Sequence, residues 1–146
     1  MTTTLSGKNI GILIEEKIAG SVLATTEDYV FVEPAMVLEA ATFLKNDPAT
    51  RCDYLNMVTS ADYFDYFEVV YVLSSLTHNH TITLKTRIYD RETPSVPSVT
   101  GLWQGADFQE REIYDLMGIR FAGHYNMKRI FLWEGYEGHP LRKDYL

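Results

Sequence analysis

The sequence predicts an α+β domain in which helices cover an antiparallel sheet of about four to five strands, followed by an extended C-terminal tail. Three observations indicate this class. Residues 81–89 alternate apolar and polar side chains, as a half-buried strand does. Three other segments space their apolar residues as amphipathic helices do. The last two dozen residues are rich in large apolar side chains but follow neither period.

The first two helices are indicated by apolar spacing and by residues that favour helix ends. The spacing predicts a helix within residues 5–19, with Gly20 offering a stop. Pro34 suits the first position of a second helix, which we expect to end before Pro48. Their inward residues are expected to be Ile10, Ile14 and Ile18 in the first helix, and Val37, Leu38, Ala41 and Leu44 in the second.

A third helix is expected from Ala106, with Asp107 near its N-terminus and Gly118 as a left-handed stop. Its inward side chains are expected to be Phe108, Ile113, Leu116 and Met117. The segment before it, residues 92–105, contains two prolines and small polar residues and is expected to be an extended loop.

Strands are expected on both sides of the second helix. Residues 22–32 read as two short strands around a Thr-Glu-Asp turn. Short links containing Asp62 and Asn79 favour consecutive antiparallel hairpins further along. The strands of those hairpins are expected at residues 52–59, 67–74 and 81–89.

Composition excludes several kinds of site and partner. Cys52 is the only cysteine, which excludes intrachain disulfides and iron–sulfur clusters held by this chain alone. It is most simply a small core residue, and a reducing compartment fits. No apolar run approaches the roughly 20 residues needed to cross a bilayer, and residues 1–12 lack the features of a signal peptide. We therefore expect a soluble chain that is not exported.

The charge is unevenly distributed. The net charge is −7; residues 1–123 contain 9 Lys or Arg against 17 Asp or Glu, and residues 124–146 contain 4 against 3. Nucleic acids and anionic membranes demand clustered Lys and Arg. An acidic body therefore argues against both as partners.

The charged third helix invites a catalytic interpretation, with its carboxylates and His124 as acids and bases. Glu110 and Glu112 are two residues apart on a helix and point to different sides, whereas Arg111 and Asp115 are four apart and can pair. We therefore interpret the segment as a charged helix face with one internal ion pair.

Other candidate sites are weaker. Two histidine pairs, His124 with His139 and His78 with His80, lack a third ligand at characteristic spacing, so neither predicts a metal site. The glycines at 101 and 105 lack the strand and helix context of a nucleotide loop. Ser98 and Thr100 have no partnered base nearby in the sequence.

The tail has too many large apolar groups for a solvated segment and too little pattern to fold alone. Its large apolar residues are Ile130, Phe131, Leu132, Trp133, Tyr136, Leu141, Tyr145 and Leu146. Arg129, Arg142, Lys143 and Asp144 lie among them, as charged residues do in protein interfaces. We expect the tail to become ordered on a surface already built, mostly that of a partner protein.

Three consecutive stretches, EREIYDLMGIRFAGH, KRIFLWEGYE and GHPLRKDY, resemble the signature of the C-type, or 30 kDa, subunit of respiratory complex I (NADH:quinone oxidoreductase). A weaker resemblance extends upstream through residues 52–74 and the run TLKTRIYD. Tyr125, Met127 and Phe131 depart from the family's usual Pro, Leu and smaller aliphatic, which alters the surface that the tail presents. The matching positions are Glu110, Arg111, Glu112, Asp115, Gly118, Ile119, Phe121, Gly123, His124, Arg129, Ile130 and the run from Gly138 to Tyr145.

The resemblance implies a non-catalytic subunit in the peripheral arm of the complex, on the cytoplasmic face of the cell membrane. Residues 1–122 would form the α+β domain of the C-type subunit, and residues 123–146 a tail packed on the D-type large subunit. NADH, FMN, iron–sulfur clusters and quinone would be bound by other subunits, and none by this chain. The assembly would transfer electrons from NADH or another donor to quinone, coupled to ion translocation. Membrane association would come only through the complex.

The resemblance assigns the motif residues to folding and to contacts between subunits. Two alternatives remain: the equivalent subunit of a membrane-bound nickel–iron hydrogenase or coenzyme F420 dehydrogenase, and a stand-alone small enzyme that uses Glu112 and His124. The residues expected to serve folding and docking are Glu110, Arg111, Glu112, Asp115, Gly118, His124, Arg129, Trp133, His139, Pro140, Arg142, Lys143 and Asp144.

Overall fold

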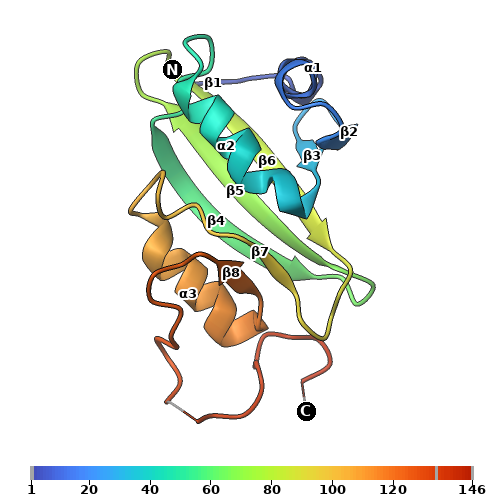
Figure 1. Cartoon of the computed structure of the whole chain (residues 1–146), viewed down its shortest axis with the longest axis vertical. Helices are drawn as coiled ribbons and strands as arrows, with labels where there is room; N and C mark the ends of the chain where they lie inside the picture. The colour runs from blue at the N-terminus through green and yellow to red at the C-terminus, as the bar shows by residue number, and fades with distance from the viewer. Residues whose placement is uncertain (1, 134, 146) are drawn as a thin grey trace.

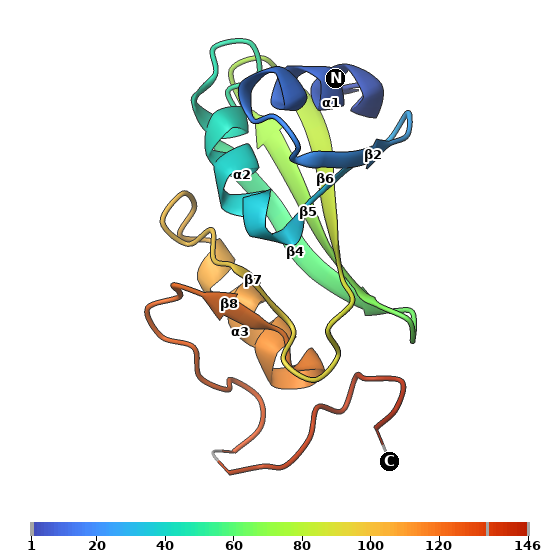
Figure 2. The ribbon, with the colours of Figure 1, turned by 45° about the vertical axis from the view of Figure 1, so that its right-hand side comes forward.

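The computed structural model describes residues 2–133 and 135–145 and shows a twisted sheet with helices on one of its faces (Figure 1). Below the sheet and α3, the chain ends in an irregular tail (Figure 2). The elements in chain order are β1 (Thr3–Thr4), α1 (Gly7–Lys17), β2 (Val22–Thr25), β3 (Val30–Val32), the short 3₁₀ helix η1 (Pro34–Met36), α2 (Val37–Asn46), β4 (Tyr54–Asp62), β5 (Phe67–Ser75), β6 (His80–Ile88), β7 (Ser95–Pro97), α3 (Ala106–Met117) and β8 (Arg120–Ala122).

The α+β class is confirmed, and the main sheet is mixed rather than wholly antiparallel. Its strands follow the order β2-β3-β6-β5-β4, with β1 also pairing with β6. The predicted hairpins β2-β3, β4-β5 and β5-β6 are antiparallel. The pairings of β3 and β1 with β6 are parallel. Parallel strands need a long connection between them, and here many residues separate β1 and β3 from β6. Six strands therefore replace the four to five expected.

The helix predictions hold with shifted ends, but Leu38, expected to face the core, is 38% exposed. α1 is shorter than residues 5–19, and Gly20 beyond it takes a left-handed backbone with φ +82°. Pro34 begins a single 3₁₀ turn that leads directly into α2. The segment expected to be an extended loop contains β7, which pairs in parallel with β8 in a second, two-stranded sheet. Strands of two or three residues carry too little periodicity to be found from sequence.

The core lies between the sheet and the helices. β6 alternates buried and partly buried residues along its whole length, as its sequence predicts. Cys52 lies just before β4 and is fully buried; burial, assisted by the neighbouring Asp53, raises the pKa of its thiol to about 12. The largest fully buried apolar side chains are Tyr71, Phe67, Ile14, Leu44, Leu73, Ile82, Leu84 and Ile119.

α3 covers the end of the core next to the edge strand β4 (Figure 1). The side-chain oxygen of Gln109 accepts the Val58 N–H at 2.6 Å. The indole N–H of Trp103 donates to the Cys52 carbonyl at 3.2 Å. The first contact joins α3 to the edge strand, and the second joins the segment before α3 to the segment before β4. Among the helices of the described residues, none is long and apolar enough to cross a bilayer.

Candidate partner-docking site

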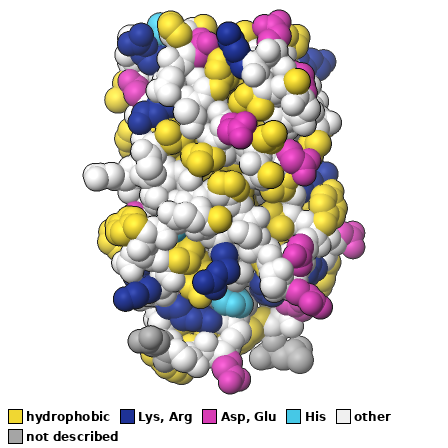
Figure 3. Space-filling model, viewed as in Figure 1, with side chains coloured by type: hydrophobic (Ala, Val, Ile, Leu, Met, Phe, Trp, Pro, Cys, Tyr) yellow, Lys and Arg dark blue, Asp and Glu magenta, His cyan; other side chains and the backbone are white. Residues whose placement is uncertain are grey.

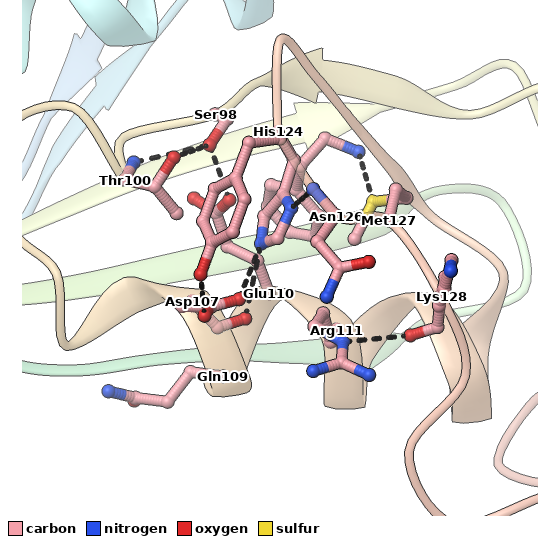
Figure 4. Close-up of polar contacts among 12 residues, drawn as sticks. Ser98, Thr100, Asp107, Gln109, Glu110, Arg111, His124, Asn126, Met127 and Lys128 are labelled. Atoms are coloured by element: carbon pink, nitrogen blue, oxygen red, sulfur yellow. Dashed lines mark hydrogen bonds and ion pairs between the residues drawn. The ribbon is translucent and has the colours of Figure 1, made fainter.

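Glu110 lies in the buried stripe of α3, together with Ala106, Ile113 and Met117. Its carboxylate accepts the Ser98 hydroxyl at 2.6 Å (Figure 4) and the Val99 N–H at 2.9 Å. Burial raises the pKa of Glu110 to about 7, while the bonds from Ser98 and Val99 act in the opposite direction. Glu110 therefore joins α3 to the segment after β7.

This burial corrects two expectations for α3. Glu110 is not part of a charged surface, and Phe108, expected to face the core, is 65% exposed. Spacings of four, three and four residues from Ala106 to Met117 include Glu110 and place Phe108 on the outer side. A carboxylate can occupy a core position here because Ser98 supplies a hydroxyl donor. Ser98 is 12 residues from Glu110, so the sequence did not show that the two side chains meet.

Asp115 is fully buried and joins α3 to the tail, but its ionic partner is Arg129. The predicted Arg111–Asp115 pair is wrong. Arg129 Nη1 donates to Asp115 Oδ1 at 2.9 Å. The Oδ2 atom accepts three consecutive backbone N–H groups of the tail, at 2.7 to 3.1 Å. Burial alone would raise the pKa of Asp115, but the hydrogen bonds from residues 129–132 outweigh it and lower the pKa.

Arg111 also binds the tail, through its carbonyls. Its Nε donates to the Lys128 carbonyl at 3.0 Å and its Nη2 to the Arg129 carbonyl at 3.3 Å (Figure 4 draws the first contact). The Nε and Nη2 donors of Arg111 are thus directed at the tail backbone, while Asp115 takes its donors from Arg129 and the tail N–H groups. Arg111 and Asp115 therefore hold the tail separately instead of pairing with each other.

The last carbonyl groups of α3 are capped by the GHPLRKDY stretch. The Nδ1–H of His139 donates to the Asp115 carbonyl at 3.0 Å, and the Leu141 N–H donates to the Leu116 carbonyl at 2.9 Å. Arg142 Nε donates to the Met117 carbonyl at 2.6 Å. These carbonyls have no partner within the helix, and a guanidinium there also favours the negative end of the helix dipole. Burial lowers the pKa of His139, which favours the neutral ring.

Gly118 ends α3 as predicted, with φ +77°. A Cβ atom at this position would lie 2.6 Å from both the Arg142 guanidinium and the His139 ring. The tail thus approaches the helix end so closely that glycine is required for space as well as for conformation.

A second anchor holds the end of the tail. The Asp62 carboxylate binds the Arg91 guanidinium through two bonds of 2.7 and 2.9 Å and accepts the Lys143 N–H at 2.9 Å. Arg91 Nη2, which donates to Asp62, also donates to Asp144 Oδ2 at 3.3 Å. The Arg91 bonds hold the pKa of Asp62 well below its usual range. Pro140, between the two anchors, is half-buried.

His124 has a structural environment. Its Nε2 lies 3.0 Å from Asp107 Oδ1 and its Nδ1 accepts the Asn126 N–H at 2.9 Å (Figure 4). The side chain has no exposed surface. Glu112 is exposed and forms no hydrogen bond with His124 among the described residues. The arrangement therefore does not support the predicted alternative of an acid–base pair.

The other histidines bind backbone carbonyls. His78 Nε2 lies 2.8 Å from the Pro48 carbonyl oxygen, and His80 Nε2 lies 2.7 Å from that of Thr50. Within residues 2–133 and 135–145, no group of three His, Cys, Asp or Glu side chains is arranged to hold a metal ion.

The tail binds its own domain through polar groups and directs large side chains outward. Phe131, Trp133 and Leu141 are 63%, 68% and 60% exposed. Tyr125 and Tyr145 are exposed as well, whereas Leu146, also expected in the apolar set, lies outside the described residues. Large exposed apolar side chains next to one another are typical of a protein interface. The polar anchors were missed from sequence because each joins groups 14 or more residues apart.

Residues 30–146 match the family described as respiratory-chain NADH dehydrogenase, 30 Kd subunit. The C-type subunit of NADH-quinone oxidoreductase from Roseiflexus sp. (strain RS-1) is 43% identical over 134 residues, which cover 90% of this chain and 76% of the relative. The mitochondrial NADH dehydrogenase [ubiquinone] iron-sulfur protein 3 of Candida albicans is 46% identical over 119 residues, which cover 80% of this chain and 42% of the relative.

This chain covers different shares of the relatives that it matches. A second C-type subunit of NADH-quinone oxidoreductase, from Rhizobium etli, is 43% identical over 81% of this chain and 64% of its own. Among solved structures, a chain of the membrane-bound sulfane sulfur reductase, an archaeal respiratory membrane complex, superposes with a TM-score of 0.71 over 95% of this chain and 85% of its own, at 24% identity, which shows a shared fold. The family match and the identities above 40% together show that the chain belongs to the 30 Kd subunit family of the respiratory-chain NADH dehydrogenase.

Proposed function

We propose that this chain is a non-catalytic subunit of a complex I-type NADH:quinone oxidoreductase and that its tail docks on the D-type large subunit. The observation that carries the proposal is the division of the tail into an inward polar side and an outward apolar side. Asp115 and Arg111 hold the tail backbone in place, while Phe131 and Trp133 point outward. Prior ordering of the tail lowers the entropy cost of binding a partner.

The names of the relatives support an NADH-linked assembly. The relatives from Roseiflexus, Rhizobium and Candida are named as subunits of NADH-quinone oxidoreductase or as a protein of NADH dehydrogenase. The proposal therefore favours this assembly over the hydrogenase and F420 alternatives. NADH, FMN, iron–sulfur clusters and quinone would be held by other subunits, on the cytoplasmic face of the membrane. The role of this chain would be to fix the positions of its redox-active neighbours.

The test compares two double-alanine variants of the tagged full-length chain, purified with its partners from solubilised membranes. Phe131→Ala/Trp133→Ala removes two outward side chains and leaves the backbone bonds to Asp115 in place. Removing such interface anchors is expected to cost about 2 kcal/mol or more each and to abolish recovery of the large subunit. The matched control is Leu23→Ala/Leu76→Ala, because these side chains are also exposed but belong to β2 and to the β5–β6 connection rather than to the tail.

The point variants are more informative than a chain ending at Phe121. That truncation would also remove the groups that cap α3, so a loss of partner could reflect a damaged helix. Recovery of the large subunit at the wild-type level by the Phe131→Ala/Trp133→Ala variant would contradict the proposal.

A further inference from the structure

A surface pocket of about 290 Å³ lies between α3 and the tail. It is smaller than most small-ligand sites and of the size that one or two side chains fill. Met127 and Leu132 give it an apolar part, and Lys128 and Arg129 a cationic part. The lining residues are Tyr114, Met127, Lys128, Arg129, Leu132 and Gly135.

The positive charge around this pocket is not neutralised by carboxylates of the described residues. Arg111 donates to the backbone carbonyl groups of residues 128 and 129. These carbonyl groups have no net charge, so they do not neutralise the guanidinium. Arg120 is exposed, with its guanidinium 5.4 Å from the ring centroid of Tyr114. Lys128 is exposed, and neither Lys128 nor Arg120 has an ion-pair partner in the part of the chain that the structure describes. Arg129 is the exception, because Asp115 neutralises it.

The acidic groups of α3 are directed elsewhere. Asp115 is buried and saturated by Arg129 and three N–H groups. Glu112 lines a different pocket, together with Val58 and Leu141. Figure 3 shows Lys and Arg side chains gathered low on this face, in the region where Figure 1 places α3 and the tail. Lys and Arg side chains thus lie next to this pocket on a chain whose net charge is −7.

We propose that this pocket receives an acidic segment of the large subunit, with a carboxylate bound to Lys128 and its aliphatic stem against Met127 and Leu132, while Arg120 adds positive charge next to the lining residue Tyr114. The inference rests on the proposed function and adds the chemistry of the partner. Charge complementarity identifies the occupant: cations that no described carboxylate neutralises attract a carboxylate, and the apolar lining favours a side chain with methylene groups over a free inorganic anion.

The first experiment measures recovery of the large subunit by the tagged full-length chain at increasing salt concentration. Lys128→Met keeps the aliphatic stem and removes the charge, and Arg120→Gln does the same at the second position. The double variant is expected to reduce recovery about tenfold at low salt and to flatten its dependence on salt. Lys17→Met is the matched control, because Lys17 is exposed on α1, away from the tail.

The second experiment detects the carboxylate directly. A carbodiimide joins an amine to a carboxylate that touches it, so treatment of the assembled complex is expected to link Lys128 to an Asp or Glu of the large subunit, identified by mass spectrometry. Lys17 should give no such link.

The outcomes separate this inference from the function on which it rests. Unchanged recovery and salt dependence in the double variant, or absence of the Lys128 link, would overturn the acidic occupant. If the Phe131→Ala/Trp133→Ala variant loses the large subunit while either of these results is obtained, the proposal that the tail docks on the large subunit still stands. A link from Lys128 to a subunit other than the large one would also overturn the assignment.

Discussion

Arg129 Nη1 lies 2.9 Å from Asp115 Oδ1 and 3.0 Å from the Asp115 carbonyl oxygen, so one guanidinium binds both the side chain and the backbone of the same helical residue. Its Nη2 donates to the Gly138 carbonyl at 3.0 Å. Arg129 therefore connects α3 to two separate parts of the tail. The tail lies along α3 because the buried Asp115 carboxylate takes its hydrogen-bond donors from the tail.

Asp115→Asn is expected to loosen the tail and destabilise the domain. The amide keeps one acceptor oxygen but cannot serve both Arg129 and the three N–H groups that bind Oδ2. Breaking a buried pair of this kind costs about 3–5 kcal/mol, to be measured by urea unfolding. Hydrogen exchange should show lost protection at Ile130, Phe131 and Leu132. Glu112→Gln, at an exposed position of the same helix, should stay within about 0.5 kcal/mol of wild type.

Gly118→Ala is expected to destabilise the protein more than Gly20→Ala. Both glycines have a positive φ, so each alanine bears the left-handed backbone cost of about 1–2 kcal/mol. Only at Gly118 does a new Cβ meet Arg142 and His139, whereas the space around Gly20 is open. The difference between the two melting temperatures therefore measures the tail contact. Equal losses would show that the tail moves aside without cost.

Acid is expected to release the tail. The pKa values of Asp62 and Asp115 are lowered in the folded state, so their stabilisation is present above the ordinary carboxyl pKa of 3.8. It is lost as pH falls below that value toward the folded pKa values, because protonation removes the acceptors that hold the tail. Amide protection at Phe131 and Lys143 should fall in that window. Persistent protection at these amides in strong acid would contradict this.

Glu110 is expected to give the opposite pH dependence. Its pKa is raised in the folded state from 4.5 to about 7, so the folded protein binds a proton that the unfolded chain releases. The free energy of unfolding should decrease as pH rises from about 4.5 to 7, by on the order of 3 kcal/mol. Glu110→Gln keeps an acceptor oxygen for the Val99 N–H, places an amide N–H donor next to the Ser98 hydroxyl and does not titrate, so it should abolish this slope. Urea titrations at several pH values measure it, and a slope retained in the variant would assign it to another group.

Local patterns sufficed where neighbours in sequence determine the structure. The alternation in β6 and the helical spacing of α1 and α2 were readable because each depends on which face of a single element is buried. Gly118 was readable because a helix stop depends on the backbone of one residue. Phe108 was misplaced because the buried stripe of α3 includes Glu110, and only contact with Ser98 makes a carboxylate acceptable there.

The sequence by itself determined the α+β class, the three helices, the central hairpins and the motifs of the 30 Kd subunit family. The tertiary structure decided which charges meet. Asp115 pairs with Arg129 rather than Arg111, and Asp62 holds Arg91 and the Lys143 backbone 81 residues away. The physical reason is that periodicity records which side of an element avoids water, whereas a buried charge takes whichever donors the whole fold brings within hydrogen-bonding distance.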